Sequence, residues 1–213
     1  MIAESQHGLN IETMGCTGYS TNLALRLIFK AQYGLDINIS DRFVNKISGT
    51  TKNGNTVDAP IDAIRHFGFL TEKEYPWDHD SFTWEEYYKE IPQNLKELAL
   101  TRLNDWDFIH EYVPVNPQIL IKALETSPIV GGVYAWLKDG DIYYDGGLPP
   151  NHLTTIIVDY EYGKYWLCAD SYSNDFNYKE EKPEMFLKKL DWNYNFRFAK
   201  RYMIIDKRDS KRR

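Results

Sequence analysis

Three residues far apart in the sequence have the side chains and local settings of a thiol-based catalytic site. Cys16 lies in the turn Met14-Gly15-Cys16-Thr17-Gly18, directly before an amphipathic stretch that predicts a helix. A thiol is nucleophilic only as the thiolate, and the start of a helix favours that anion. His152 begins one strand-like stretch and Asp170 ends the next. We therefore predict Cys16 as nucleophile, His152 as general base and Asp170 as the acceptor that orients the imidazole.

Each of these residues also has a purely structural interpretation. A single cysteine is often a small buried side chain, a histidine at the start of a strand is often structural, and an aspartate at the end of a strand often belongs to a turn. Asp175 is the alternative to Asp170 as the third residue of the site. Cys168 lies inside an aromatic, strand-like stretch, and we predict that its thiol is part of the core.

The elements that must position these residues follow from hydrophobic periodicity and from helix caps. Ser40 and Asn116 are expected N-caps, and Gly34, Gly49 and Gly68 are expected stops. Helices are predicted over residues 16–33, 40–49, 57–67, 92–102 and 118–126, and an extended segment over 108–113. Strands are predicted over residues 129–137, 141–144, 153–160, 165–169 and 198–205. Helices followed by antiparallel strands predict an α+β fold with a cleft between its two halves.

Composition excludes several classes of protein. The chain has 213 residues, enough for one domain, and a net charge of −6, which disfavours nucleic acid as its main partner. Its basic tail, residues 207–213, has the character of a solvated terminus. No apolar stretch reaches the length of a membrane span, and no secretory signal is visible at the start of the sequence. Two cysteines give no disulfide framework, which indicates a reducing compartment or a fold that does not need disulfides. With no visible signal, we expect a cytoplasmic or other reducing intracellular compartment, or a piece trimmed from a longer precursor.

The order of these motifs resembles that of the papain-like cysteine peptidases, over residues 10 to 205. Cys16 at the start of a helix is similar to the nucleophile of that family, and Asn151-His152-Leu153 is similar to the segment around its catalytic histidine. Further similar segments are Asn53-Gly54-Asn55, Gly68-Phe69-Leu70-Thr71-Glu72-Lys73-Glu74-Tyr75-Pro76-Trp77 and Tyr165-Trp166-Leu167 with Asp170-Ser171-Tyr172. The resemblance implies a single papain-like domain over residues 1–213. Its helical half would span about 10–112 and its antiparallel β half about 113–205, with a basic tail at 206–213.

The resemblance also implies roles for further residues. The family takes an oxyanion donor from a glutamine six positions before the nucleophile, where this chain has Asn10; Gln6 is the alternative. Substrate backbone would pair along Gly54 and Asn55, and the family alignment implies that Val57 and Leu153 line an apolar pocket. The alternative is that Val57 and Leu153 are ordinary core positions of a helix and a strand.

One departure from the family concerns the third residue of the site. The family carries an amide at the position of Asp170, so the resemblance predicts that Asp170→Asn keeps substantial activity.

The leading hypothesis from the sequence is a cysteine endopeptidase that hydrolyses peptide bonds through an acyl-enzyme, without a metal or other cofactor. Its partner would be a protein or peptide substrate, and not nucleic acid or a membrane, and the chain would be a monomer. A peptidoglycan-cleaving papain-like amidase or endopeptidase is one alternative. A catalytically weak binding module that keeps the cleft is another. The chain would resemble bacterial or viral relatives more than secreted members.

Overall fold

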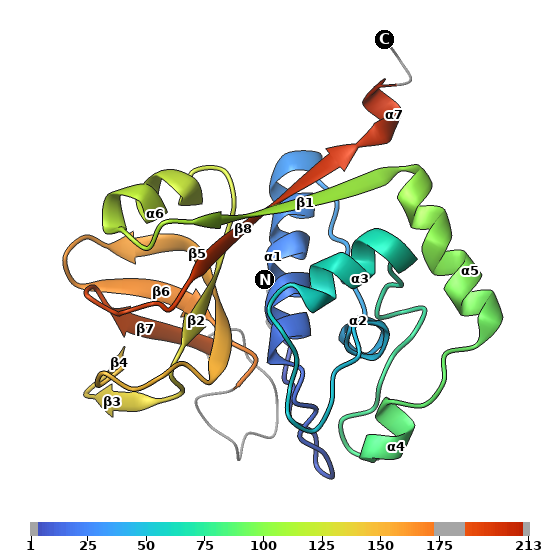
Figure 1. The fold of residues 1–213 in the computed structure, drawn as a ribbon, viewed down its shortest axis with the longest axis horizontal. Helices are drawn as coiled ribbons and strands as arrows, with labels where there is room; N and C mark the ends of the chain where they lie inside the picture. The colour runs from blue at the N-terminus through green and yellow to red at the C-terminus, as the bar shows by residue number, and fades with distance from the viewer. Residues whose placement is uncertain (1–3, 173–185, 211–213) are drawn as a thin grey trace. The chain divides into compact units, whose positions relative to one another are not determined.

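In the computed structural model, which describes residues 4–172 and 186–210, the chain divides into two compact units (Figure 1). The helical unit is Gln6–His110 with Met203–Arg213, and the β unit is Met1–Ser5 with Glu111–Tyr202. The strands β1 (Trp106–Val113) and β8 (Ala199–Asp206) carry the chain from one unit into the other.

The helical unit contains the predicted helices, with ends close to those expected. Ser40 accepts a hydrogen bond from the Phe43 backbone N–H and so caps a helix, and Gly34 ends the preceding helix in the left-handed conformation that glycine adopts without strain. A short capped helix near residue 85 was not predicted. The elements are α1 (Cys16–Tyr33), α2 (Asp41–Ile47), α3 (Ala59–Phe67), α4 (Trp84–Tyr87), α5 (Gln93–Thr101), η1 (Arg102–Asn104) and α7 (Lys207–Ser210).

The core of the helical unit is rich in aromatic side chains. Phe29 of α1 is fully buried, and its ring meets the ring of Trp106 edge to face at 4.9 Å between centroids. Phe69 and Phe108 pack beside Phe29 at 6.1 and 6.3 Å. Edge-to-face contacts of this kind add to the stabilisation that apolar burial already provides. The C-terminal half of α1 is therefore held firmly, and Cys16 is at the other end of the same helix.

The β unit is built on a sheet whose strand order is β1-β8-β2-β5-β6-β7-β4-β3. Within this sheet, β2 is antiparallel to β5, β5 to β6, and β6 to β7. The pair of β7 with β4 is parallel. The helix α6 (Pro117–Leu124), capped by Asn116 as expected, packs against β2 (Figure 1). The remaining strands are β2 (Ile129–Val133), β3 (Leu137–Asp139), β4 (Ile142–Tyr144), β5 (His152–Glu161), β6 (Tyr165–Ala169) and β7 (Leu187–Asp191).

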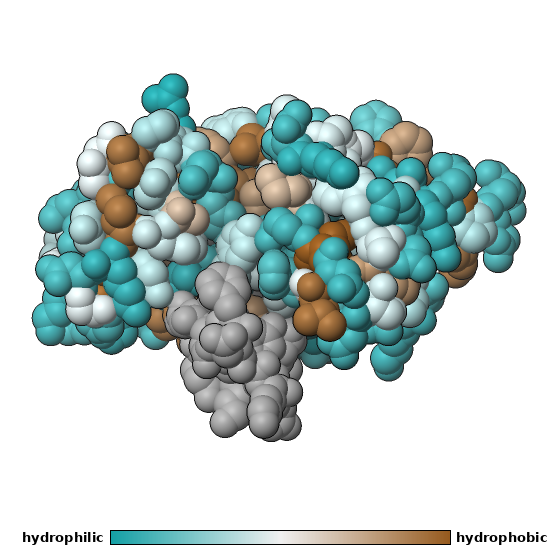
Figure 2. Space-filling view, turned by 90° about the horizontal axis from the view of Figure 1, so that it is seen from below, coloured by the Kyte–Doolittle hydropathy of each residue, from teal (hydrophilic) through white to brown (hydrophobic). Residues whose placement is uncertain are grey.

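The predicted α+β class is confirmed, with two differences in the strands. The expected strand 129–137 is two elements, because β2 ends at Val133 and β3 begins at Leu137. β7 was not expected, since its sequence Leu187-Lys188-Lys189-Leu190-Asp191 places a lysine on each face of the strand. On the face drawn in Figure 2, hydrophobic residues form small patches among hydrophilic ones. No helix among the described residues is long and apolar enough to span a membrane.

Candidate active site

Cys16 is the first residue of α1 and is only partly buried. Gly15 is the N-cap and brings no capping side chain, so the helix start makes no side-chain cap hydrogen bond. The first N–H groups of a helix have no partner within the helix, and they favour a negative charge placed beside them. The local structure therefore places Cys16 at a helix N-terminus, as predicted from the sequence, in a partly exposed position.

The start of α1 is fixed by Asn45, a fully buried side chain of α2. Asn45 Nδ2 donates a hydrogen bond of 3.0 Å to the Tyr87 hydroxyl. The amide of Asn45 also lies so close to α1 that a Cβ on Gly15 or Gly18 would be 2.2 or 2.1 Å from its atoms. Gly15 and Gly18, on either side of Cys16, are thus required because Asn45 packs directly against them. The sequence alone does not reveal this constraint.

This packing predicts a measurable loss of stability in Gly18→Ala. A new methyl group 2.1 Å from Asn45 Oδ1 must displace a buried amide, and the overpacking is expected to cost about 1–3 kcal/mol in the free energy of unfolding, despite the better helix propensity of alanine. Urea denaturation measures this loss. In an Asn45→Ala background, which removes the clash, Gly18→Ala should instead be neutral or stabilising. Equal costs in both backgrounds would contradict the account.

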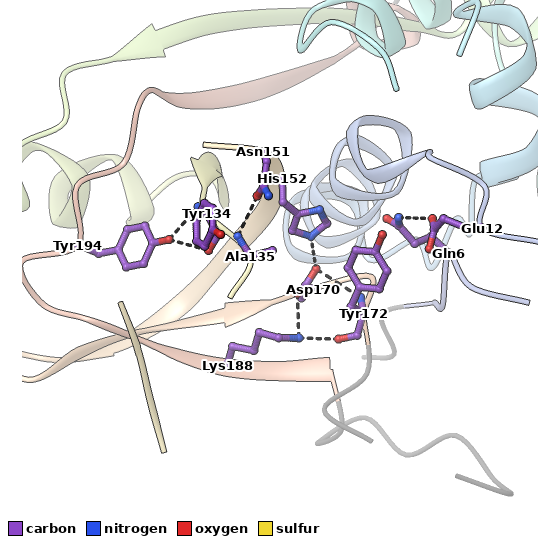
Figure 3. Close-up of polar contacts among 10 residues, drawn as sticks. All are labelled: Gln6, Glu12, Tyr134, Ala135, Asn151, His152, Asp170, Tyr172, Lys188 and Tyr194. Carbon is purple, nitrogen blue, oxygen red and sulfur yellow. Dashed lines mark hydrogen bonds and ion pairs between the residues drawn. The ribbon is translucent and has the colours of Figure 1, made fainter. Parts of the chain in front are cut away.

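The two candidate oxyanion donors have different environments. Gln6 is buried, and its Nε2 donates to Glu12 Oε1 at 2.7 Å (Figure 3). The same carboxylate oxygen accepts from the Met14 backbone N–H at 3.1 Å, so Gln6 is linked through Glu12 to the turn before Cys16. Asn10 is exposed, and its Nδ2 donates to the Asp80 carbonyl at 2.9 Å. Gln6 is therefore tied to the turn before Cys16, whereas Asn10 is tied to the loop that contains Asp80.

The predicted substrate-binding residues lie in both units. Gly54 has a φ of 82°, a conformation that glycine adopts without strain, but its N–H and C=O both pair with Thr51. The Asn55 amide donates to the Ser48 carbonyl at 2.9 Å and therefore holds its own loop. Val57 is half-buried in the helical unit, and Leu153 is buried in the β unit.

His152 and Asp170 form a buried pair in the β unit. Their strands β5 and β6 are antiparallel neighbours, so the start of one lies beside the end of the other. His152 Nε2 is 2.6 Å from Asp170 Oδ1, and Figure 3 shows the ring pointing at the carboxylate. The side chains are 4% and 0% exposed. Trp136 and Tyr172 lie against the imidazole, at 5.6 and 5.0 Å between ring centroids.

Lys188 completes this cluster and was missed in the sequence. Its Nζ lies 2.8 Å from Asp170 Oδ2, on the opposite side of the carboxylate from His152. Burial acts to raise the pKa of the Asp170 carboxyl, but attraction to His152 and Lys188 outweighs burial and holds that pKa below its usual value. Asp170 is therefore an ionised, buried acceptor with a cationic partner. Sequence reasoning could have found Lys188 only by predicting β7, in which Lys188 and Leu190 are the two buried positions.

The structure thus brings together His152 and Asp170 of the predicted site, and places Cys16, Asn10, Gly54, Asn55 and Val57 in the helical unit. Cys168 is fully buried in the β core, as predicted, and burial raises the pKa of its thiol well above the usual value. Asp175, the alternative third residue, lies outside the described residues. In residues 4–172 and 186–210, no three histidine, cysteine or acidic side chains are grouped to hold a metal ion.

The fold of the chain is similar to that of several cysteine proteases. Digestive procathepsin L 3 of Tenebrio molitor larval midgut matches with a TM-score of 0.67 and 16% identity, over 95% of this chain and 66% of that one. The proform of Amb a 11, a cysteine protease and major ragweed pollen allergen, matches with a TM-score of 0.68 and 17% identity, over 97% and 63%. The Carica candamarcensis cysteine protease CMS1MS2, in complex with E-64, matches with a TM-score of 0.68 and 15% identity, over 95% and 92%.

The chain therefore spans less than two thirds of the length of the Amb a 11 proform and nearly all of the Carica protease chain. No protein-family model and no curated protein sequence matches it. At such low identity the structural matches establish the fold alone. The chain has the papain-like α+β fold of these cysteine proteases, as a divergent example of it.

Proposed function

We propose that the chain is a cysteine endopeptidase whose catalytic residues are Cys16, His152 and Asp170. The observation that carries the proposal is the buried 2.6 Å contact between His152 and Asp170, in a papain-like fold whose first helix begins with an accessible cysteine. A histidine held in this way has a fixed orientation and a fixed tautomer, with Nε2–H directed at the carboxylate. Its Nδ1 is then the nitrogen that exchanges a proton with the thiol.

In the proposed reaction the Cys16 thiol gives its proton to His152, and the sulfur attacks the carbonyl carbon of the peptide bond. The C–N bond breaks, His152 returns the proton to the leaving amine, and a thioester remains on Cys16. Water, deprotonated by His152, hydrolyses the thioester and releases the acid. The Cys16 backbone N–H and a side-chain amide donate hydrogen bonds that stabilise the negative charge developing on the carbonyl oxygen.

The proposal is tested by cleavage of a library of internally quenched peptides, with mass spectrometry to locate the cut. We expect cuts inside peptides, with one amine and one acid terminus formed per event, and none in Cys16→Ala. Peptidoglycan fragments are assayed in parallel. Release of stem peptides without cleavage of the library would favour the peptidoglycan-cleaving alternative, and binding without turnover in either assay would favour a non-catalytic module.

We propose Gln6, and not Asn10, as the side chain that supplies the second oxyanion donor. Gln6 is buried and linked through Glu12 to the Met14 N–H of the turn before Cys16, whereas the exposed Asn10 amide serves the Asp80 carbonyl. Gln6→Ala is therefore expected to lower kcat by about 10²–10³-fold with little change in KM, since the contact forms with the oxyanion. Asn10→Ala is the matched control and should stay within about threefold of the parent. A large fall in kcat in Asn10→Ala, together with a parent-like kcat in Gln6→Ala, would reverse the assignment.

A further inference from the structure

We propose that Lys188 is a positioning residue of this site, and that Lys188 and Asp170 act as one electrostatic unit in which neither residue can be replaced alone. The inference rests on the proposed function for its activity readout. The unit itself is defined by contacts within the β unit, so it also has readouts that need no turnover.

The register of two strands places Lys188 beside Asp170. β6 and β7 are antiparallel, and Cys168 pairs with Lys188 in their register. The Asp170 backbone N–H donates to the Phe186 carbonyl at 2.9 Å, which extends the same pairing beyond the end of β6. Residues 168, 170, 186 and 188 therefore share one face, and Asp170 and Lys188 are diagonal neighbours across the strands. Sheet geometry alone brings the ammonium to the carboxylate.

The contacts of Lys188 are those of a buried structural cation. Its side chain is 2% exposed, and its Nζ lies 2.8 Å from Asp170 Oδ2 and donates to the Tyr172 carbonyl at 2.5 Å (Figure 3). The same ammonium lies over the ring of Trp136 at 5.2 Å and at 6.0 Å from the centre of the Tyr143 ring. Each oxygen of the Asp170 carboxylate thus faces one basic group, His152 on Oδ1 and Lys188 on Oδ2.

This arrangement changes the charge that the imidazole meets. A buried carboxylate alone would favour the imidazolium strongly, whereas an adjacent ammonium offsets that attraction. The Asp170–Lys188 pair has a net charge of zero and still offers His152 a hydrogen-bond acceptor. In these two respects it is equivalent to the neutral amide that the resembled family carries at the position of Asp170.

A consequence is that Asp170→Asn alone should not be tolerated, contrary to the expectation from family resemblance. The change leaves the Lys188 ammonium buried without its counter-charge, and breaking a buried pair in this way is strongly destabilising. Lys188→Met leaves the Asp170 carboxylate without its ammonium partner and exposes His152 to the full negative charge. The two changes together remove both charges and leave an amide acceptor, so they should compensate each other.

The experiment compares the parent chain with Asp170→Asn, Lys188→Met and the double variant. In urea denaturation, each single change should raise the unfolding equilibrium constant by about 10²–10³-fold, and the double variant should regain most of this loss. Lys189→Met is the matched control on the same strand. Lys189 is more exposed and pairs with Asp141 on the surface, so its loss should change the constant less than about fivefold.

A second readout follows the His152 ring by nitrogen NMR, in a Cys16→Ala background in which no thiol competes for the proton. At fixed pH the ratio of charged to neutral imidazole should rise about tenfold or more in Lys188→Met and fall about tenfold or more in Asp170→Asn. The double variant should lie near the parent. Among the described residues of the β unit, the groups placed against the ring include Asp170, Trp136 and Tyr172, and Lys188 lies behind the carboxylate. If Lys188 only stabilised the fold, Lys188→Met would leave the ratio of charged to neutral imidazole unchanged.

The outcomes separate the inference from the proposed function. Compensation in stability and in the NMR ratio, with no peptidase activity in any variant, would support the unit and overturn the proposed function. Peptidase activity with strictly additive losses, or with silent single variants, would overturn the unit and leave the function standing. If the single variants do not fold, a folded double variant supports the unit and an unfolded one overturns it.

Discussion

Cys16→Ala is expected to lower kcat/KM for peptide hydrolysis by about 10⁴–10⁶-fold, the range typical for loss of a catalytic nucleophile. The free energy of unfolding should change by less than about 0.5 kcal/mol, because Cys16 is only partly buried and begins a helix that is held by other residues. A quenched-peptide assay and urea denaturation measure the two effects separately.

Cys168→Ala is the control for this change and should give the reverse result. Cys168 is fully buried in the β core, so its truncation is expected to cost about 1 kcal/mol in stability while most of the activity remains. If Cys16→Ala kept its activity and Cys168→Ala lost it, the nucleophile would have been assigned to the wrong thiol.

His152→Ala is the second large loss, expected at about 10⁴-fold or more in kcat. The change removes both the group that takes the thiol proton and the cationic partner that the thiolate requires. It also leaves Asp170 Oδ1 without the imidazole that lies 2.6 Å from it, so a fall in stability should accompany the loss. Initial rates at saturating substrate measure kcat, and denaturation measures stability.

His66→Ala is the matched control among the five histidines of the chain. His66 is exposed on α3, and its Nδ1 lies 2.7 Å from the Asp62 carbonyl of its own helix. Its removal should leave kcat within about twofold. A parent-like kcat in His152→Ala would show that this imidazole has no part in the chemistry.

Local signals in the sequence predicted most of the fold. Gly34, Ser40 and Asn116 act over one turn of helix, and each is a cap in the structure as expected. β6 was predicted with its observed ends, since an uninterrupted aromatic and apolar stretch is typical of a buried strand. β7 was not, because a buried lysine at its centre breaks that pattern and is explained only by Asp170 on the neighbouring strand.

The residue types of the candidate site could be predicted from the sequence, but the residues that hold them in place could not. His152 and Asp170 were expected to pair, and they do, because adjacent antiparallel strands place them side by side. The roles of Lys188 and Asn45 come from contacts with residues distant in the sequence, and hydrophobic periodicity does not reveal such contacts. The sequence indicates Asn10 as the oxyanion donor, because it lies six positions before Cys16. Our proposal of Gln6 instead uses its burial and its hydrogen bond to Glu12, which depend on how the segment before α1 folds.

The most direct test of the proposed mechanism is covalent labelling with E-64, which the structure of the similar Carica protease contains, or with a peptidyl epoxide. Intact-protein and peptide mass spectrometry give the number and position of adducts. The mechanism predicts one adduct, on Cys16, absent from Cys16→Ala and strongly slowed in His152→Ala, with the buried Cys168 unmodified while the protein is folded. Labelling of Cys168 alone, or no labelling of a chain shown to be folded, would contradict the central claim that Cys16 is an activated nucleophile.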